Sequence, residues 1–118
     1  MLLLFLAVFG ISTSGLYAQS SELKLDLIGQ YQTGIFDEGA AEISAYDAAS
    51  KRLFFTNADQ NAIVVLDLSD PTNPIEITTI DMTPFGDGVN SVATSNGLVA
   101  VAVQADPVTS PGSVEFFN

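Results

Sequence analysis

The sequence contains neither cysteine nor histidine, and the two absences exclude several kinds of chemistry. Without cysteine the chain has no disulfide, no thiol nucleophile and no cysteine for lipidation. Without histidine it lacks the commonest general base and the commonest zinc ligand. An exported domain with a large enough core needs no disulfides, so the missing cysteines remain compatible with export.

Basic residues are scarce as well: Lys and Arg total 3 against 14 Asp and Glu, which makes the formal net charge −11 at pH 7. Nucleic acids and anionic membrane surfaces are recognised through basic patches, so we expect neither as a partner. Strong acidity suits either cation binding or a well-solvated exported surface, and the second interpretation is the simpler one.

Motifs of nucleotide binding and of serine catalysis are missing too. No Gly-x-Ser-x-Gly elbow surrounds a serine, and neither a phosphate-binding loop nor a dinucleotide fingerprint is present. Beyond residue 18 no apolar stretch has a helical period. These absences favour an all-β chain without nucleotide chemistry.

Residues 1–18 read MLLLFLAVFGISTSGLYA and predict a secretory signal peptide with cleavage after Ala18. Its apolar stretch, from Leu2 to Ile11, is shorter than the roughly 20 residues that a membrane span needs. The usual basic start is missing, since Lys24 is the first basic residue, and an uncleaved N-terminal anchor is the alternative. We therefore expect an extracytoplasmic protein, secreted or on the cell surface, with no membrane span after signal removal.

The remainder of the sequence alternates between β-rich runs and turns of Gly, Pro, Asn, Asp and Ser. The predicted strands are 22–31, 42–46, 52–56, 62–68, 75–82, 97–103 and 114–118. In the first run Leu23, Leu25 and Leu27 fall on one face, which is typical of a half-buried strand. Residues 63–80, IVVLDLSDPTNPIEITTI, combine an apolar run, a proline-containing turn and a second β-rich run, and predict a hairpin.

The sequence also matches itself at an offset of 49 residues, which lays residues 27–46 over residues 76–95, with Phe36 on Phe85. After the turns the offset becomes 45 and then 51, so the strands stay aligned while the gaps fall in turns. A period in the high forties with about four strands per repeat predicts the blades of a β-propeller.

Three stretches carry a resemblance to known repeats. Residues 63–77, IVVLDLSDPTNPIEI, resemble the LVIVD-type propeller repeat, and residues 53–67, LFFTNADQNAIVVLD, resemble the YVTN-type repeat. The ordered set of residues 39–47 (GAAEISAYD), 51–74 (KRLFFTNADQNAIVVLDLSDPTNP) and 87–106 (DGVNSVATSNGLVAVAVQAD) is most similar to the choice-of-anchor I domain family. The resemblance implies a secreted or surface-attached β-propeller protein of mostly bacterial occurrence.

The resemblance further implies a protein much longer than this chain, because propellers close with typically 4 to 8 blades. Residues 19–118 would be the N-terminal portion of the propeller, holding about two of roughly six to eight blades. The repeats would span about 27–75 and 76–118, the second one truncated. The remaining blades of the same protein would then be partners of this portion, with residues 22–31 as the outer strand of the last blade.

Two acidic loops occupy matching positions of the repeat, residues 36–39 (FDEG) and 85–88 (FGDG). Their carboxylates, Asp37, Glu38 and Asp87, would ring one mouth of the propeller, where clustered oxygens suit a hard cation such as Ca²⁺. Alternatively, glycine shapes each turn, phenylalanine caps the core and the acids face water. We favour the second interpretation because the dense Asp-x-Asp-x-Asp spacing is absent.

Glu42 and Asn90 lie at the start of the inner strands, where propellers place side chains that face a ligand. A buried carboxylate there could act as a general base or a metal ligand. Bonding to backbone groups of a neighbouring blade is the other interpretation, and we favour it. By contrast, Asp67, Ser69 and Asp70 are expected to be scaffold, because Ser-Asp-Pro turns use side-chain oxygens to satisfy turn amides.

The leading hypothesis for function is a binding or interaction module on the cell surface or outside the cell, whose ligand or surface partner the sequence does not identify. The alternative is a metal-assisted hydrolase, phosphatase- or esterase-like, with an acidic site at the propeller mouth. We expect no catalysis in this segment and no cofactor, with Ca²⁺ as the one candidate ion.

The calcium hypothesis predicts that millimolar Ca²⁺ raises the melting temperature of the protein and that a chelator reverses the rise, because a ligand that binds only the folded state stabilises it. Thermal melting followed by circular dichroism measures this. A melting temperature that responds to neither addition excludes a calcium site in the acidic loops.

Overall fold

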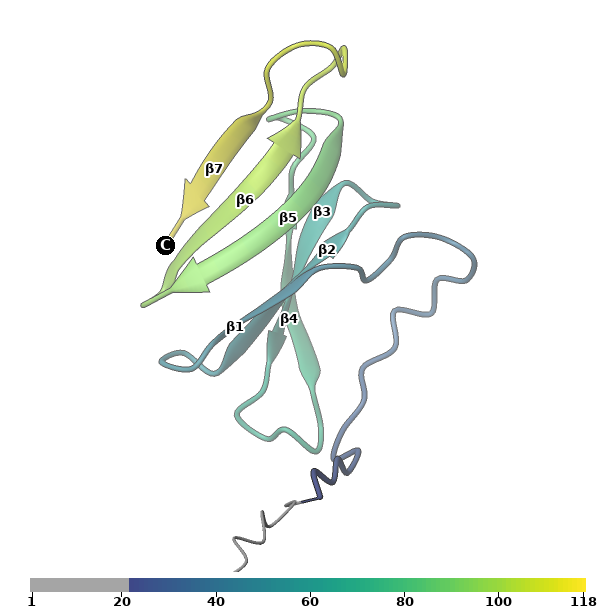
Figure 1. Ribbon diagram of the computed structural model, residues 1–118, viewed down its shortest axis with the longest axis vertical. Coiled ribbons are helices and arrows are strands. Elements are labelled where there is room, and N and C mark those ends of the chain that lie inside the picture. Colours follow the sequence, from purple (N-terminus) through teal and green to yellow (C-terminus); the bar gives the residue numbers. More distant parts are fainter. Residues whose placement is uncertain (1–21) are drawn as a thin grey trace, which may run out of the picture.

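The computed structural model describes residues 22–118, and every regular element in this range is a strand (Figure 1). The strands are β1 (Ser44–Asp47), β2 (Arg52–Asn57), β3 (Ala62–Asp67), β4 (Ile75–Asp81), β5 (Gly88–Ser95), β6 (Leu98–Gln104) and β7 (Ser113–Phe117). The all-β class predicted from the sequence is confirmed. The predicted signal peptide lies outside the described residues. Within the described range no helix could cross a membrane.

The strands form two antiparallel sheets in which neighbours in sequence are neighbours in space. The first sheet has 4 strands in the order β1-β2-β3-β4, and the second has 3 strands in the order β5-β6-β7. Each sheet is thus a meander, as in a propeller blade. The second copy of the 49-residue repeat begins in β4, one strand before the second sheet, so its bounds differ from those of a sheet by one strand.

Turn residues fix where the strands reverse. The β5–β6 turn consists of Asn96 and Gly97, which both have positive φ, at 52° and 83°. A two-residue turn with this geometry matches the right-handed twist of the flanking strands, and Asn-Gly is its preferred sequence. In the β2–β3 turn Asn61 also has a positive φ, 48°, and its side-chain Nδ2 donates to the Gly86 carbonyl at 2.8 Å. This bond ties a turn of the first sheet to the segment that leads into the second.

The main core lies between the two sheets. Phe54 on β2 and Ile63 and Val65 on β3 face Val92 on β5 and Val101 on β6, and all five side chains are buried. Strand β5 is the element of the second sheet that contacts β1, β2 and β3. Because side chains alternate along a strand, these residues form one face of the first sheet.

The opposite face of the first sheet holds a second apolar cluster. Phe55, Val64 and Leu66 are its buried members, with Leu53, Leu68 and Tyr31 packed against them. Among residues 22–118 no strand covers this face, which we call the open face of the first sheet. Tyr31, from the segment before β1, lies against Phe55 with ring centroids 6.0 Å apart.

The predicted strand at residues 22–31 is wrong. The segment is extended but belongs to neither sheet, and Leu23, Leu25 and Leu27 are 85%, 86% and 85% exposed. A strand needs a partner for its backbone groups, and this segment pairs with no strand of the described chain. The apolar residues of this segment alternate as in a strand, but no strand within residues 22–118 pairs with it. The other predicted strands are present, with ends shifted by one or two residues.

The position of Ile63 predicts a large effect of truncation. Ile63 is 0% exposed between the sheets, so Ile63→Ala should lower the free energy of unfolding by about 2–5 kcal/mol, through lost burial and an unfilled cavity. Ile77 on β4 is 45% exposed, and the matched Ile77→Ala substitution should cost about 1 kcal/mol or less. Urea unfolding of both variants measures the difference, and equal losses would contradict the assignment of the core.

Candidate functional site

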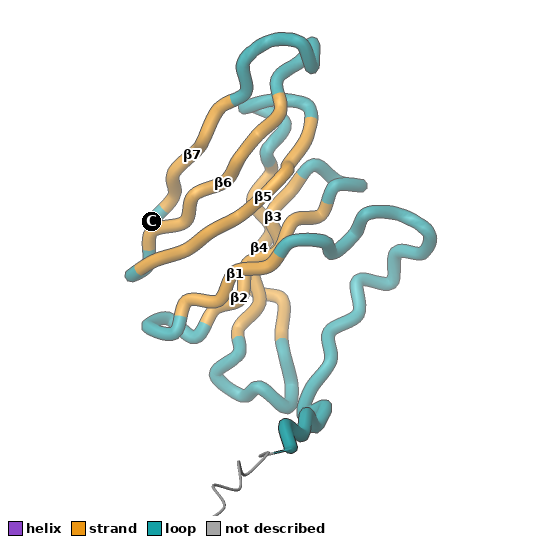
Figure 2. The backbone as a smooth tube through the Cα atoms, in the orientation of Figure 1, coloured by secondary structure: helices purple, strands orange, loops and turns teal. Residues whose placement is uncertain are grey.

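Several loops meet at one end of the two sheets. Strands alternate in direction, so the β2–β3 turn, the β6–β7 loop and the segments leading into β1 and β5 share an end. Backbone bonds join them: the Ala58 amide donates to the Gly39 carbonyl at 2.7 Å, and the Asp87 amide donates to the Gln104 carbonyl at 2.9 Å. Figure 2 shows the β6–β7 loop and the β2–β3 turn in the upper half of the view, and the β1–β2 and β3–β4 turns in the lower half.

Charge is unevenly divided between the two ends. We call the end with the joined loops the acidic loop end. Its carboxylates are Asp37, Glu38, Glu42, Asp59, Asp81, Asp87 and Asp106. The basic residues Lys51 and Arg52 lie at the opposite end, in and after the β1–β2 turn, and Lys24 pairs with Asp26 at 3.0 Å. The acidic loop end is therefore a surface of one charge sign.

The acids of the paired loops are exposed rather than gathered around one point. Asp37, Glu38 and Asp87 all have exposed side chains. Asp37 has a φ of 64°, and the Glu38 carbonyl accepts from the Ala40 amide at 2.8 Å, so this loop is a tight turn. No group of three or more acidic residues within residues 22–118 is arranged to hold a metal ion. The loops present carboxylates to water without forming a coordination site.

Glu42 lies just before β1, and Asn90 lies within β5. The Glu42 amide donates to the Thr56 carbonyl at 3.3 Å, just before β1 begins, while its side chain is exposed. Asn90 occupies the register shift in β5 between Val89 and Ser91, and its side chain is exposed too. For neither side chain does the described structure contain a hydrogen bond to a neighbouring blade. Both side chains are therefore exposed near the starts of β1 and β5.

The phenylalanines of the two paired loops differ in their contacts and in their exposure. Phe85 stacks edge-on against Phe117 of β7, with centroids 5.9 Å apart and an interplanar angle of 82°. Phe36, its counterpart in the repeat, is 93% exposed. Phe85 is 42% exposed, so it packs on Phe117 at the margin of the core, whereas Phe36 makes no such contact within the described residues.

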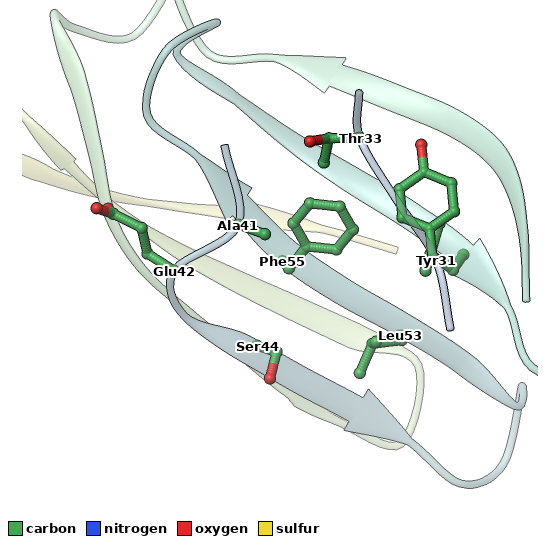
Figure 3. A pocket seen from close by; sticks show the side chains of 8 residues that line it. Tyr31, Thr33, Ala41, Glu42, Ser44, Leu53 and Phe55 are labelled. Carbon is green, nitrogen blue, oxygen red and sulfur yellow. The ribbon is translucent and has the colours of Figure 1, made fainter. Parts of the chain in front are cut away.

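A pocket of about 280 Å³ lies on the open face of the first sheet (Figure 3). Tyr31 and Phe55 form its apolar part, with Thr33, Ser44 and Glu42 around them. Figure 3 shows the Glu42 carboxylate directed away from the two aromatic rings. The Tyr31 hydroxyl donates to the Glu76 carboxylate of β4, which holds the ring over the sheet and raises the pKa of the tyrosine. The pocket is thus an apolar recess with a polar rim.

The turn role expected for Asp67 and Asp70 is confirmed. The Ser69 amide donates to Asp67 at 2.7 Å, and the Thr72 hydroxyl donates to Asp70 at 2.7 Å. These bonds stabilise the ionised carboxylates and lower the pKa of both groups, with the largest effects from Ser69 and Thr72 respectively.

Asp47, at the end of β1, is buried and is held in the same way. The Ser50 hydroxyl donates to its Oδ2 at 2.6 Å and the Ser50 amide at 3.1 Å. These donors, with the backbone of Gly97 in the β5–β6 turn, lower the pKa of the Asp47 carboxyl against the opposing effect of desolvation. Asp47 therefore links a turn of the first sheet to a turn of the second.

Sequence reasoning missed Asp59, Asp106 and Tyr31. Asp59 and Asp106 lie in hairpin turns, and the alternation of strand direction could have placed those turns at the same end as the paired loops. Tyr31 was assigned to a strand, although the 49-residue offset lays it over Ile80, which packs into the core between the sheets. The match of Tyr31 to a core residue could have predicted that Tyr31 packs against an apolar side chain such as Phe55.

Comparison with known proteins gives one match. A protein-family model described as choice-of-anchor I domain matches residues 42–118, more than half of the chain. This description indicates a surface-associated, extracellular module. No curated protein and no solved structure gives a significant match.

The lowered pKa of Asp47 predicts how stability depends on pH. A carboxyl whose pKa is lower in the folded state stabilises the fold above its unfolded pKa, near 3.9, and the stabilisation is lost as the pH falls through the folded value. Asp47→Asn should therefore be less stable than the parent at pH 7, with a difference that shrinks below about pH 4.

Urea unfolding at several pH values measures this difference. Asp59→Asn is the matched control, because it removes the same charge from an exposed turn where the carboxylate accepts no hydrogen bond within residues 22–118. A deficit of Asp47→Asn that stays constant from pH 7 to pH 2 would contradict the role of the Ser50 bonds.

Proposed function

The chain belongs to the choice-of-anchor I domain family, and from this premise we propose that it is an exported β-propeller module that binds a positively charged partner at the cell surface or outside the cell. The acidic loop end is the proposed contact surface. The observation that carries the proposal is that the acidic loop end bears charge of one sign, whereas the other end mixes Asp47, Asp67 and Asp70 with basic residues. Carboxylates alone occupy the acidic loop end, and Lys51 and Arg52 lie at the other end.

The single charge sign of the acidic loop end has a direct physical consequence. Like charges gathered on one surface add their potentials, and a field of one sign attracts a partner of the opposite sign and speeds its approach. If charges of both signs were scattered over the surface, their potentials would cancel at the distances over which association begins. The exposed Asp37, Glu38 and Asp87 contribute to this field without internal ion pairs to neutralise them.

The scaffold beneath the loops supports the same proposal. Binding residues are commonly carried on loops that a rigid core positions. Here the loops are joined to one another by the bonds from Ala58 to Gly39 and from Asn61 to Gly86, and they rest on the buried strands β2 and β3. A preorganised loop surface loses less conformational entropy when it binds.

The metal-assisted hydrolase has no supporting observation in the described chain. Such an enzyme needs a metal held by several converging ligands and a group that activates water. Glu42 and Asp87 are exposed, and residues 22–118 contain no acidic group of three or more in a metal-binding arrangement. We therefore propose binding and not hydrolysis for this surface.

The proposal predicts salt-sensitive binding to a basic peptide through the acidic loop end. An immobilised oligolysine peptide serves as the probe, and surface plasmon resonance measures affinity at several salt concentrations. Replacing Asp37 with Asn and Glu38 with Gln should weaken binding several-fold at low salt and reduce the salt dependence, because two charges leave the contact surface.

The matched control removes two charges elsewhere, through Glu22→Gln together with Asp26→Asn. Both variants have the same net charge, so a purely global effect of charge would weaken them equally. Equal losses would refute the acidic loop end as the contact surface, and so would binding that salt does not change.

A further inference from the structure

The β5–β6 turn carries a chemically labile pair of residues. Asn96-Gly97 is the one Asn-Gly pair of the sequence, and both residues are exposed. When glycine follows asparagine, no side chain shields the backbone nitrogen of the glycine, which can attack the side-chain amide carbon of the asparagine. The pair is therefore a candidate site of spontaneous deamidation, a covalent change that the binding proposed above does not involve.

The reaction needs only these two residues and water. The Gly97 nitrogen loses its proton and bonds to the Asn96 Cγ, the side-chain nitrogen leaves as ammonia, and a succinimide ring results. Water then opens the ring at either of its carbonyl carbons, which leaves aspartate or isoaspartate at position 96. Both products add a negative charge, and isoaspartate also lengthens the backbone of a turn whose geometry depends on its two-residue length.

The side chain of Asn96 is available for this reaction. Within the described residues its one hydrogen bond runs from Nδ2 to the Ser95 hydroxyl, and at 3.5 Å this bond is long and weak. Any restraint on the reaction must therefore act on the other reacting group, the backbone amide of Gly97.

The Gly97 amide is held from two directions. Ser95 lies opposite Leu98 in the β5–β6 ladder, which fixes both ends of the turn. Asn96 and Gly97 have φ values of 52° and 83°. The Gly97 amide takes no part in the ladder and donates instead to the Asp47 carboxylate. Figure 1 shows the β5–β6 turn next to the β1–β2 turn, which follows Asp47, at the left edge of the view.

Asp47 is fixed in place at this contact. It is 5% exposed, and the Ser50 hydroxyl and amide donate to its Oδ2 at 2.6 and 3.1 Å. Strand β1, which ends at Asp47, packs against β5. A carboxylate held in this way cannot follow the Gly97 amide when the peptide rotates, so rotation of the peptide breaks a charge-assisted hydrogen bond.

We propose that Asn96 is a deamidation site and that Asp47 slows its reaction by holding the Gly97 amide away from the Asn96 side chain. The Gly97 nitrogen must leave its acceptor before it can turn toward the Asn96 Cγ. The contact between the two turns thus sets how long the β5–β6 turn stays intact. Asp47 acts here as a positioning residue.

Activation of the amide by Asp47 would be the opposite role. A carboxylate that took the proton of the Gly97 amide would act as a general base, and a carboxylate with a lower pKa is a weaker base. The Ser50 bonds lower the pKa of the Asp47 carboxyl, so Asp47 is poorly suited to remove this proton. The two roles predict opposite effects when the carboxylate is removed.

Incubation at neutral pH followed by peptide mass spectrometry measures the reaction at position 96, because replacement of the amide by an acid changes the mass of the peptide. In the folded parent protein the reaction should be several-fold slower than in the parent unfolded in guanidinium chloride. Asp47→Ala removes the acceptor and should speed the reaction of the folded chain several-fold. Asp47→Asn keeps an oxygen that can accept from the Gly97 amide, and its rate should lie between those of the parent and Asp47→Ala.

Ile63→Ala is the matched control for global unfolding. It lowers stability through the core between the sheets, at a position near the opposite end of β3, and leaves the contact of Asp47 with Gly97 in place. The rate of Ile63→Ala should stay close to that of the parent. Equal acceleration in Ile63→Ala and Asp47→Ala would overturn the proposal, because it would assign the effect to unfolding.

Ser50→Ala keeps the test decisive if Asp47→Ala does not fold. It loosens the Asp47 carboxylate without removing it, so deamidation should again be faster than in the parent. A rate in the folded variants equal to or below that of the parent would overturn the restraint by Asp47. Equal rates in the folded and the unfolded parent would overturn it as well.

Discussion

The whole arrangement depends on strand β3 being apolar on both of its faces. Ile63 and Val65 point to one side and Val64 and Leu66 to the other, and each of them is at most 3% exposed. A strand of this kind cannot leave either face of its sheet in water, because burial of aliphatic side chains is the main favourable contribution to folding. The second sheet meets this requirement on one side, and the segment that carries Tyr31 meets it in part on the other.

This constraint leaves the ends of the strands as the main places where side chains can bind a ligand. Faces of the sheets are used for packing, so side chains that can meet a ligand come from turns and from the segments between sheets. At one end these turns carry only carboxylates, because Lys51 and Arg52 occupy the opposite end. The open face is the exception, because a pocket with an apolar floor lies there beside Phe55 and Tyr31.

Much of the fold could be predicted because local patterns act over a few residues. The apolar run at residues 62–67, the Asn-Gly pair at 96–97 and the caps at Asp67 and Asp70 each specify a strand or a turn with little help from the rest of the chain. The strand expected at 22–31 failed for the opposite reason. Its apolar residues alternate as in a strand, but a strand forms only when its backbone pairs with another strand, and within residues 22–118 none pairs with it.

By itself the sequence determined the all-β class, the repeat, the surplus of acidic residues and the family, since these follow from composition and from patterns with a period of two or of nearly fifty residues. Only the tertiary structure decided which acids share an end, that the paired loops remain open to water, and that Tyr31 lies on Phe55. These outcomes rest on contacts between residues far apart in the chain, such as Asn61 with Gly86. No local pattern encodes such contacts, because their free energy appears only when the two sheets have packed together.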